Sequence, residues 1–346
     1  MLLAELLYNH FEMKDTRLNT FKGIIKSLML CRGSKYKNMA EEIEGDKLLD
    51  SKIKAVYRFL QEDNINIDDY YKYMKNYIPQ GKVVLSIDRT TWELGQEIRN
   101  ILVLSVSYNK IAMPLIYKII PYKGACTADD QIAVISKFIE EFGKEKIEGI
   151  LGDREFDNEK LITYLHNKNI NYALRVRRTN RIVNKEGQWI RIDSMKEIKI
   201  RNFSTRFYSV PVKFDHIKLA SGEYLSIVYS KNMSNGSEIY RKRWDIEAAF
   251  KGCKSNGFRM EDTHIKSKVR LENFIKCLFI AYAMAIKIGA IGEQEQPIKM
   301  KKTLGCRSYS VLQLGIRSIK QAYSRSKQFF DSLIIKLFKL HFVQPT

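Results

Sequence analysis

The segment KVVLSID, residues 82–88, is a short run rich in β-branched residues that ends in an aspartate. A second apolar run, IEGILGD at residues 147–153, ends in the same way. Runs of this length and composition predict buried β-strands. An ionisable group at the end of a core strand is costly unless something binds it, and in open α/β sheets the carboxyl ends of strands form the binding crevice. The two segments therefore predict an α/β fold with Asp88 and Asp153 in one site.

The segments around these two strands complete the pattern of a mixed α/β sheet. NILVLSVSY (100–108) and KIAMPLIYKII (110–120) flank a turn-like YNK and predict a hairpin. TADDQIAVISKFIEEFG (127–143) predicts an amphipathic helix with Thr127 as N-cap and Gly143 at its end. A helix near 157–167 and a strand at 171–177 follow. This order predicts a sheet core with helices on both of its faces.

Changes in hydrophobic periodicity and composition along the sequence predict five regions in the chain. Apolar residues at helical spacing predict an N-terminal helical domain in residues 1–78. Residues 79–177 hold the first part of the sheet core, and the alternating segments of 178–235 predict an all-β insertion into it. Helices resume in 236–295 with the second part of the core. Residues 296–346 predict a basic helical tail.

The charge of the chain favours a polyanionic partner. Its 346 residues carry a net charge of +20 and a pI of about 9.5. The surplus lies mainly in 174–235, with 13 Lys/Arg against 5 Asp/Glu, and in 297–346, with 10 against 1. Such a surplus favours nucleic acid or an acidic membrane surface. Considered alone, the surplus of Lys and Arg is also compatible with ordinary solvated charge on the protein surface.

Other features of the composition narrow the classes of protein to which this chain can belong. No apolar run reaches about 18 residues, so no membrane span is expected, and the apolar run at 277–292 is interrupted by Lys287 and predicts a buried helix. The five cysteines and five histidines are scattered. This spacing argues against a zinc knuckle or a disulfide framework and indicates a reducing cytoplasm. A metal in this protein is therefore expected to be held by carboxylates.

The third acid lies in YRKRWDIEAAFKGCK, residues 240–254. On one helix, Tyr240, Arg243, Glu247 and Lys254 fall within an arc of roughly 60°. Alone, such a stripe is typical of a salt-bridged surface helix, in which Glu247 pairs with Arg243 and Lys251. A single strand-end aspartate is likewise a common cap or turn former.

The combination of three acids favours a different interpretation. Carboxylates are the ligands that hold two Mg²⁺ ions roughly 4 Å apart in phosphodiester chemistry. Arg243 and Lys254 would then hold DNA phosphates beside the metals. Tyr240 would donate a hydrogen bond to the DNA backbone, and Trp244 would stack on or pack against the DNA end. Arg154 either contacts DNA or, like Glu155, caps the helix that follows it.

These residues resemble the bacterial insertion-sequence transposases of the D-D-E type, which have an RNase H-like catalytic core. The spacing Tyr-x2-Arg-x3-Glu-x6-Lys is the YREK signature of the insertion-sequence-four family, and residues 240–254 match it at every position. SIDRT (86–90) and GDREFDN (152–158) look like the family's first- and second-aspartate motifs. KSNGFRMEDTHI (254–265) is similar to the segment after the signature. The resemblance covers residues 15–290.

The resemblance implies a cut-and-paste transposase of the bacterial cytoplasm that associates with the nucleoid when it is bound to DNA. It implies that Asp88, Asp153 and Glu247 bind Mg²⁺, or Mn²⁺ as a substitute. It further implies a β-rich insertion and an N-terminal domain that binds terminal inverted repeats. It also implies a homodimer in which each subunit cuts the DNA end held by the other, often through a hairpin intermediate.

Two alternatives remain open at this stage. One is a nuclease of the same core that lacks strand transfer. The other is an inactive or domesticated DNA-binding protein derived from a transposase. The intact set of three acids counts against the second alternative, because binding alone does not require it.

Overall fold

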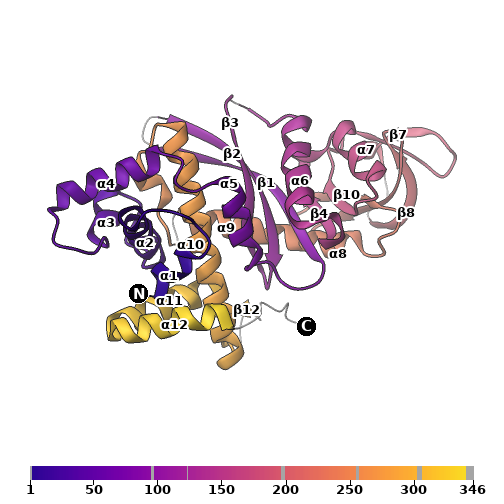
Figure 1. Ribbon diagram of the computed structural model, residues 1–346. Coiled ribbons are helices and arrows are strands. Elements are labelled where there is room, and N and C mark those ends of the chain that lie inside the picture. The colour runs from indigo at the N-terminus through magenta and orange to yellow at the C-terminus, as the bar shows by residue number, and fades with distance from the viewer. Residues whose placement is uncertain are drawn as a thin grey trace.

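A ten-stranded mixed sheet organises the protein (Figure 1). The computed structural model describes residues 2–94, 97–122, 124–195, 199–254, 257–301 and 306–339. The strands of the first half are β1 (Val83–Leu94), β2 (Glu97–Tyr108), β3 (Ile111–Ile120), β4 (Ile147–Gly152) and β5 (Tyr172–Arg175). Those of the second half are β6 (Arg181–Val183), β7 (Trp189–Arg191), β8 (Lys199–Phe207), β9 (Val210–Lys218) and β10 (Tyr224–Ser230).

The order of the strands is β3-β2-β1-β4-β5-β10-β9-β8-β6-β7. In the core part, β1, β2 and β3 are antiparallel neighbours, whereas β4 runs parallel to β1 and β5 runs parallel to β4. Strand β10 then pairs antiparallel with β5. The predicted fold class is confirmed, because the chain has a large mixed sheet surrounded by helices, an N-terminal helical region and an arrangement consistent with an RNase H-like core.

Two local predictions around the core are confirmed. The hairpin of β2 and β3 turns at Asn109 and Lys110, whose φ values of 49° and 66° fit a type I′ turn. Helix α6 (Ala128–Phe142) begins with a capping box in which Thr127 and Asp130 bond to each other's backbone N–H groups. Gly143, with φ of 87°, ends that helix.

Helices cover both faces of the core part of the sheet. Figure 1 shows α6 on one side of β1–β3 and α9 (Trp244–Lys254) on the other. Helix α7 (Glu159–Asn167) packs beside α6, and the long helix α10 (Lys268–Glu295) lies with α9 against β3. Because successive residues of a strand point to opposite faces, Asp88 and Arg89 of β1 project to different sides of the sheet.

The N-terminal helices do not form a separate core. They are α1 (Leu2–Tyr8), α2 (Asp15–Met29), α3 (Tyr36–Glu41), α4 (Leu49–Gln61) and α5 (Ile67–Lys75). Helices α2, α4 and α5 pack directly on α10, and their apolar residues belong to the same hydrophobic cluster as the core of the sheet. The helical character expected for this region is confirmed, and α10 joins it to the sheet.

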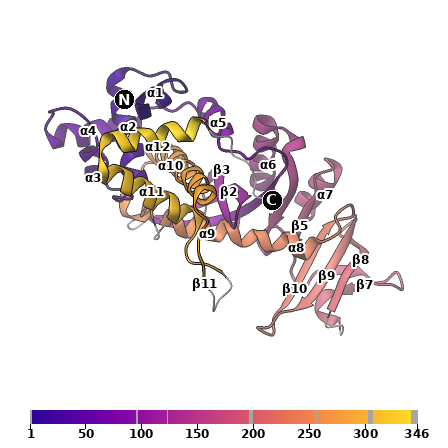
Figure 2. The ribbon, with the colours of Figure 1, turned by 90° about the horizontal axis from the view of Figure 1, so that it is seen from below.

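The described part of the tail also packs on α10. It contains the short strands β11 (Met300–Lys301) and β12 (Cys306–Arg307) and the helices α11 (Val311–Arg325) and α12 (Lys327–Lys339). Residues 302–305 and 340–346 of the expected tail lie outside the described residues. Helices α10 and α11 cross so closely that a Cβ atom on Gly315 would overlap the carbonyl oxygen of Ala285, and one on Gly289 would overlap that of Val311. Figure 2 shows α11 and α12 lying over α10.

The apolar character of α10 is explained by burial within this assembly of helices. By length and composition, α10 is the one helix in the described ranges that is apolar enough to cross a membrane, with a mean hydropathy of 1.9 over its best window. That whole window is buried inside the protein. The predicted buried helix at 277–292 is confirmed.

Two expectations about single elements were wrong. Strand β1 does not stop at Asp88 but continues to Leu94, because the antiparallel partner β2 extends beyond the end of β4. Residues 240–254 do not form one α-helix. Helix α8 (Gly236–Tyr240) is followed by a 3-10 turn at Arg241–Arg243 before α9 begins. That turn advances about 120° per residue instead of about 100°, a difference of about 60° over three residues, so Tyr240, Arg243, Glu247 and Lys254 still fall within an arc of about 40°.

Candidate active site

The structure brings Asp88 and Asp153 together at the carboxyl end of β4. The parallel register of β1 and β4 ends with Ile87 opposite Gly152, and each aspartate is the next residue on its chain. Residues in equivalent positions on neighbouring strands point to the same face, so both side chains lie on the α9 side of the sheet. The placement expected from the two apolar segments follows from this register.

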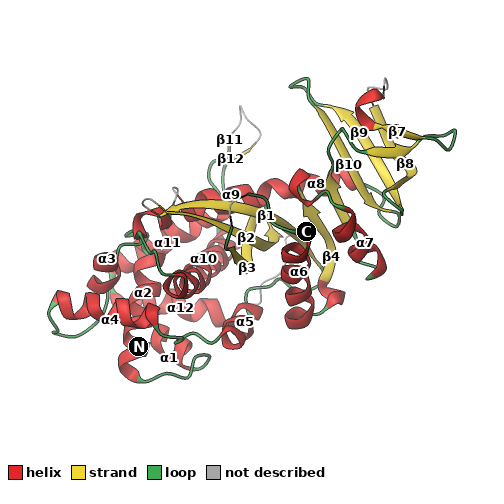
Figure 3. Cartoon of the chain, turned by 90° about the horizontal axis from the view of Figure 1, so that it is seen from above, coloured by secondary structure: helices red, strands yellow, loops and turns green. Residues whose placement is uncertain are grey.

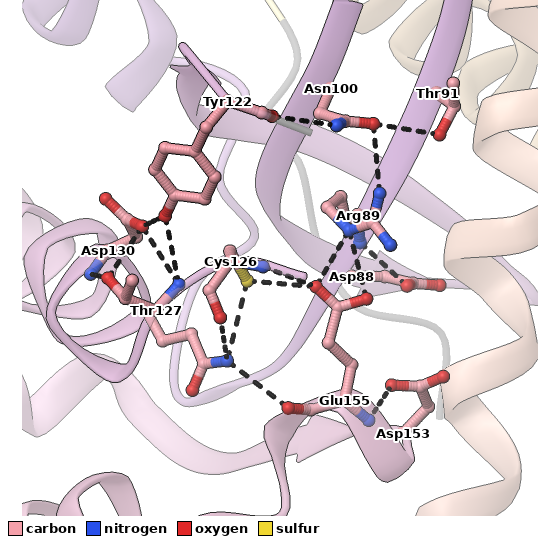
Figure 4. Close-up of polar contacts among 11 residues, drawn as sticks. Asp88, Arg89, Thr91, Asn100, Tyr122, Cys126, Thr127, Asp130, Asp153 and Glu155 are labelled. Carbon is pink, nitrogen blue, oxygen red and sulfur yellow. Dashed lines mark hydrogen bonds and ion pairs between the residues drawn. The ribbon is translucent and has the colours of Figure 1, made fainter. Parts of the chain in front are cut away.

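Backbone N–H groups fix one oxygen of each aspartate (Figure 4). Asp88 Oδ1 accepts a hydrogen bond of 2.7 Å from the N–H of Arg89, and Asp153 Oδ1 accepts one of 2.8 Å from the N–H of Glu155. The second bond caps the 3-10 turn Arg154–Phe156. Both carboxylates therefore have a set orientation in addition to a set position.

Arg243 connects the first aspartate to the third acid. Its two terminal nitrogens lie 3.6 Å from Asp88 Oδ2 and 2.6 Å from Glu247 Oε1. Arg243 is buried with 6% exposure, whereas the side chain of Glu247 is 43% exposed. The guanidinium also lies over the rings of Tyr240 and Trp244, with its central carbon 5.7 and 5.0 Å from the ring centroids. The i, i+4 pairing of Arg243 with Glu247 expected for a salt-bridged helix is present, but the arginine is buried at the sheet.

Burial and the charges of the other two acids act on Asp88. Burial raises the pKa of Asp88 to about 7, and the neighbouring charges of Asp153 and Glu247 add to the rise. The N–H of Arg89 and the charge of Arg243 act in the opposite direction. A carboxyl group in this setting takes up a negative charge readily only when more positive charge is supplied.

Two of the three acids are placed to bind a hard divalent cation. Within the described ranges, no three His, Cys, Asp or Glu side chains lie together as a ready metal site. Asp88 and Asp153 present neighbouring carboxylate oxygens, which are the donors that Mg²⁺ and Mn²⁺ favour. Glu247 is held by Arg243 instead. The expected three-acid site is therefore present as two adjacent aspartates and a third acid linked to them through a cation.

The other predicted residues occupy different environments. Tyr240 is buried, and its hydroxyl has no hydrogen-bond partner among the described residues. Its ring packs in a small cluster with Val84, Leu151, Ala173, Ile227, Tyr229 and Met233. Trp244 is 61% exposed, and Arg154 is exposed without an ion pair in the described part of the chain. The Lys254 ammonium donates to the carbonyl of Thr91 and lies 3.7 Å from Glu261 Oε1.

A polar network behind the aspartates was missed by the sequence reasoning (Figure 4). Arg89 Nε donates to both oxygens of Glu155, and its Nη1 donates to Asn100 Oδ1 at 3.0 Å. Glu155 also accepts from the backbone N–H and the thiol of Cys126, at 3.0 and 3.1 Å. The usable signal was the placement of charged residues within two positions after each aspartate, Arg89 in SIDRT and Glu155 in GDREF.

Comparison with known proteins adds one finding to this geometry. Residues 124–284 match the family model described as the transposase DDE domain. The match supports a DDE transposase. The matched residues contain Asp153, Glu247 and the strands β6–β10, while Asp88 precedes them. Domains of this kind act on DNA and generally use divalent metal ions. No curated protein matches the chain.

Proposed function

We propose that the protein is a cut-and-paste transposase of the insertion-sequence-four family that cleaves the ends of an insertion sequence and joins them to target DNA. One observation carries the proposal. The register of β1 and β4 sets Asp88 beside Asp153, and Arg243 links that pair to Glu247 on a different segment of the chain. The residue types and their spacing in 240–254, which match the YREK signature, support it further.

Asp88, Asp153 and Glu247 would hold the metal. Two bound Mg²⁺ ions, or Mn²⁺ in their place, would activate a water or a 3′-hydroxyl for attack on phosphorus and stabilise the leaving oxygen. The chain supplies the orientation, since the N–H groups of Arg89 and Glu155 fix the two aspartates. Glu247 must exchange Arg243 for the cation, which is feasible because its side chain is partly exposed.

The same exchange gives Arg243 its proposed second role. Once released from Glu247, its guanidinium can bind a DNA phosphate in bidentate fashion beside the reacting bond. Lys254 is the last residue of α9, on the side of the sheet that carries Asp88, and its ammonium donates to the carbonyl of Thr91 on β1. The exposed Trp244 and Arg154 are proposed to contact DNA, and the buried hydroxyl of Tyr240 is proposed to donate to its backbone.

The remaining parts of the proposal concern partners and location. Helices α1–α5 are proposed to bind the terminal inverted repeats. The active form is proposed to be a homodimer assembled on DNA, in the bacterial cytoplasm and associated with the nucleoid. The surplus of positive charge in the insertion and the tail supports a DNA partner.

The test is cleavage of a plasmid that carries the element's terminal inverted repeats, with substitution of each acid. Asp88→Asn, Asp153→Asn and Glu247→Gln are expected to abolish Mg²⁺-dependent end cleavage while leaving DNA binding intact. Asp129→Asn removes an exposed acid at the start of α6 and serves as the control. Retained cleavage in any acid variant would overturn the assignment of that acid. Cleavage by the wild type without joining to target DNA would identify a nuclease, and binding without cleavage an inactive descendant.

A further inference from the structure

A cavity of about 750 Å³ opens beside the start of α9, apart from the three acids. Its walls come from four parts of the chain that are distant in sequence. These are β1 at Val84, the end of β2 with the turn before β3, the 3-10 turn with the first residues of α9, and β12. The charged residues among those lining it are Lys110, Arg241, Lys242, Asp245 and Arg307.

The cavity keeps a positive surplus after its internal pairs are considered. Arg307 is neutralised by Glu293, whose carboxylate lies 2.8 Å away. Asp245 is half-buried, and it bonds to Ser107 with the charges of Lys242 and Lys110 nearby. Lys110, Arg241 and Lys242 are exposed, so these three cations face one acid. Long, exposed basic side chains around a hollow are suited to a multiply charged anion.

The position of the cavity points to the identity of that anion. Arg241 and Lys242 immediately precede Arg243, so one 3-10 turn carries both the cation at the acids and two cations of the cavity. Figures 2 and 3 show the β11–β12 strands and the sheet of the insertion projecting from the same side of the molecule, with α8 and α9 between them. A duplex held at the acids therefore passes next to this hollow.

We propose that the cavity binds the phosphates of duplex DNA next to the segment that is cleaved, without reading its sequence. The proposal rests on the proposed function, because it takes DNA as the substrate of the neighbouring acids. Lys110 and Lys242 contact phosphate oxygens and release counterions, while Arg241 offers a guanidinium at the rim. The contact positions DNA and is independent of bound metal.

The test compares two variants with the same loss of charge. Lys110→Gln/Lys242→Gln changes the cavity. Lys144→Gln/Lys168→Gln changes two exposed lysines near the ends of α6 and α7, on the opposite side of the sheet. Binding of a duplex of unrelated sequence is measured with EDTA present across a NaCl series. We expect the cavity variant to bind about tenfold more weakly and its salt slope to fall by about 2, because two phosphate contacts are lost. The control should retain nearly the wild-type values.

The outcomes separate this inference from the function on which it rests. Equal affinity and salt slope in the two variants would overturn the cavity as a DNA site. Stoichiometric binding of inorganic tripolyphosphate by the wild type but not by the cavity variant, with equal duplex affinity in both, would also overturn it, in favour of a small-ligand site. If the acid variants still cleave DNA while the cavity variant loses binding, the proposed acids fail and the cavity stands.

Discussion

Arg89 and Glu155 form an ion pair on the face of the sheet opposite the two aspartates, in which Arg89 Nε donates to both carboxylate oxygens at 2.8 and 3.0 Å. Arg89 directly follows Asp88, and Glu155 lies two residues after Asp153. Burial favours the neutral acid, yet hydrogen bonds from Arg89 and Cys126 hold the pKa of Glu155 below its ordinary value. The pair therefore ties the middle of β1 to the 3-10 turn that follows β4, on the face opposite the acids.

The first prediction concerns this pair, whose side chains are only 21% and 16% exposed. Arg89→Met leaves a charged carboxylate unpaired and should lower the free energy of unfolding by about 3 kcal/mol. Arg89→Met/Glu155→Leu should cost less than Arg89→Met alone. Urea unfolding measures both. Removing the exposed pair Lys160–Asp129 is the control and should change the free energy by less than about 0.5 kcal/mol. A comparable cost for both pairs would show that Arg89 and Glu155 do not hold the strands.

The second prediction concerns pH. The pKa of Asp88 rises from 3.8 to about 7 on folding without metal, because burial and the charge of Asp153 disfavour its ionised form. The folded state then binds the proton more tightly than the unfolded state. This contribution to stability is complete below about pH 4 and is lost as the pH rises through about 7. The Tm of the metal-free protein should fall over this range more than that of Asp88→Asn.

Protons and divalent cations should compete for the same carboxylate. The affinity for Mg²⁺ is expected to fall up to about tenfold for each pH unit below about 7. The rise in Tm on adding Mg²⁺, measured at pH values on both sides of this point, checks the expectation. A rise that is independent of pH, or that persists in Asp88→Asn, would show that Asp88 is not the titrating ligand.

The third prediction concerns the crossing of α10 and α11. Gly315→Ala places a methyl group against the carbonyl of Ala285, and since backbone cannot move cheaply, it should destabilise the protein by about 3 kcal/mol. Gly292→Ala on the same helix pair meets only ordinary van der Waals neighbours, of which Leu314 Cδ2 is the nearest at 3.5 Å. That control should be neutral or stabilising by up to about 1 kcal/mol. Equal urea midpoints for the two variants would contradict the close crossing.

The fourth prediction concerns Lys254. Lys254→Ala is expected to weaken binding of the element's ends by about tenfold and to lower the salt slope by about 1, as for one lost phosphate contact. Lys254→Arg, which keeps the charge, should retain most of the slope. Binding isotherms over a NaCl series provide the measurement. If the alanine variant keeps the wild-type slope, the lysine serves only its partners within the chain, Thr91 and Glu261.

The sequence is sufficient to predict an element wherever neighbouring residues specify that element. The hairpin at Asn109-Lys110 and the helix between Thr127 and Gly143 are specified by residues next to one another, and both form as expected. The pairing of Asp88 with Asp153 was accessible because each ends an apolar run, so strand polarity alone brings them to one edge. These features need no knowledge of distant contacts.

Features that depend on register between distant segments were not accessible. The Arg89–Glu155 pair joins residues 66 positions apart and requires the parallel alignment of β1 with β4. The extension of β1 to Leu94 depends on the length of β2. The packing of the Tyr240 ring depends on a cluster created by four strands, and the 3-10 turn that follows this residue has no marker in the residues themselves.

The continuous sheet has a practical consequence for dissecting this protein. Because β10 pairs with β5, residues 178–235, which the sequence predicted as an insertion, are joined to the core by backbone hydrogen bonds and not only by their two connections. Cutting them out would leave β5 with an unpaired row of N–H and C=O groups at the rim of the sheet, next to Asp153. Exposed edge strands of this kind form backbone hydrogen bonds with strands of other molecules. A trimmed catalytic fragment should therefore self-associate, whereas one that retains β8–β10 should remain dispersed.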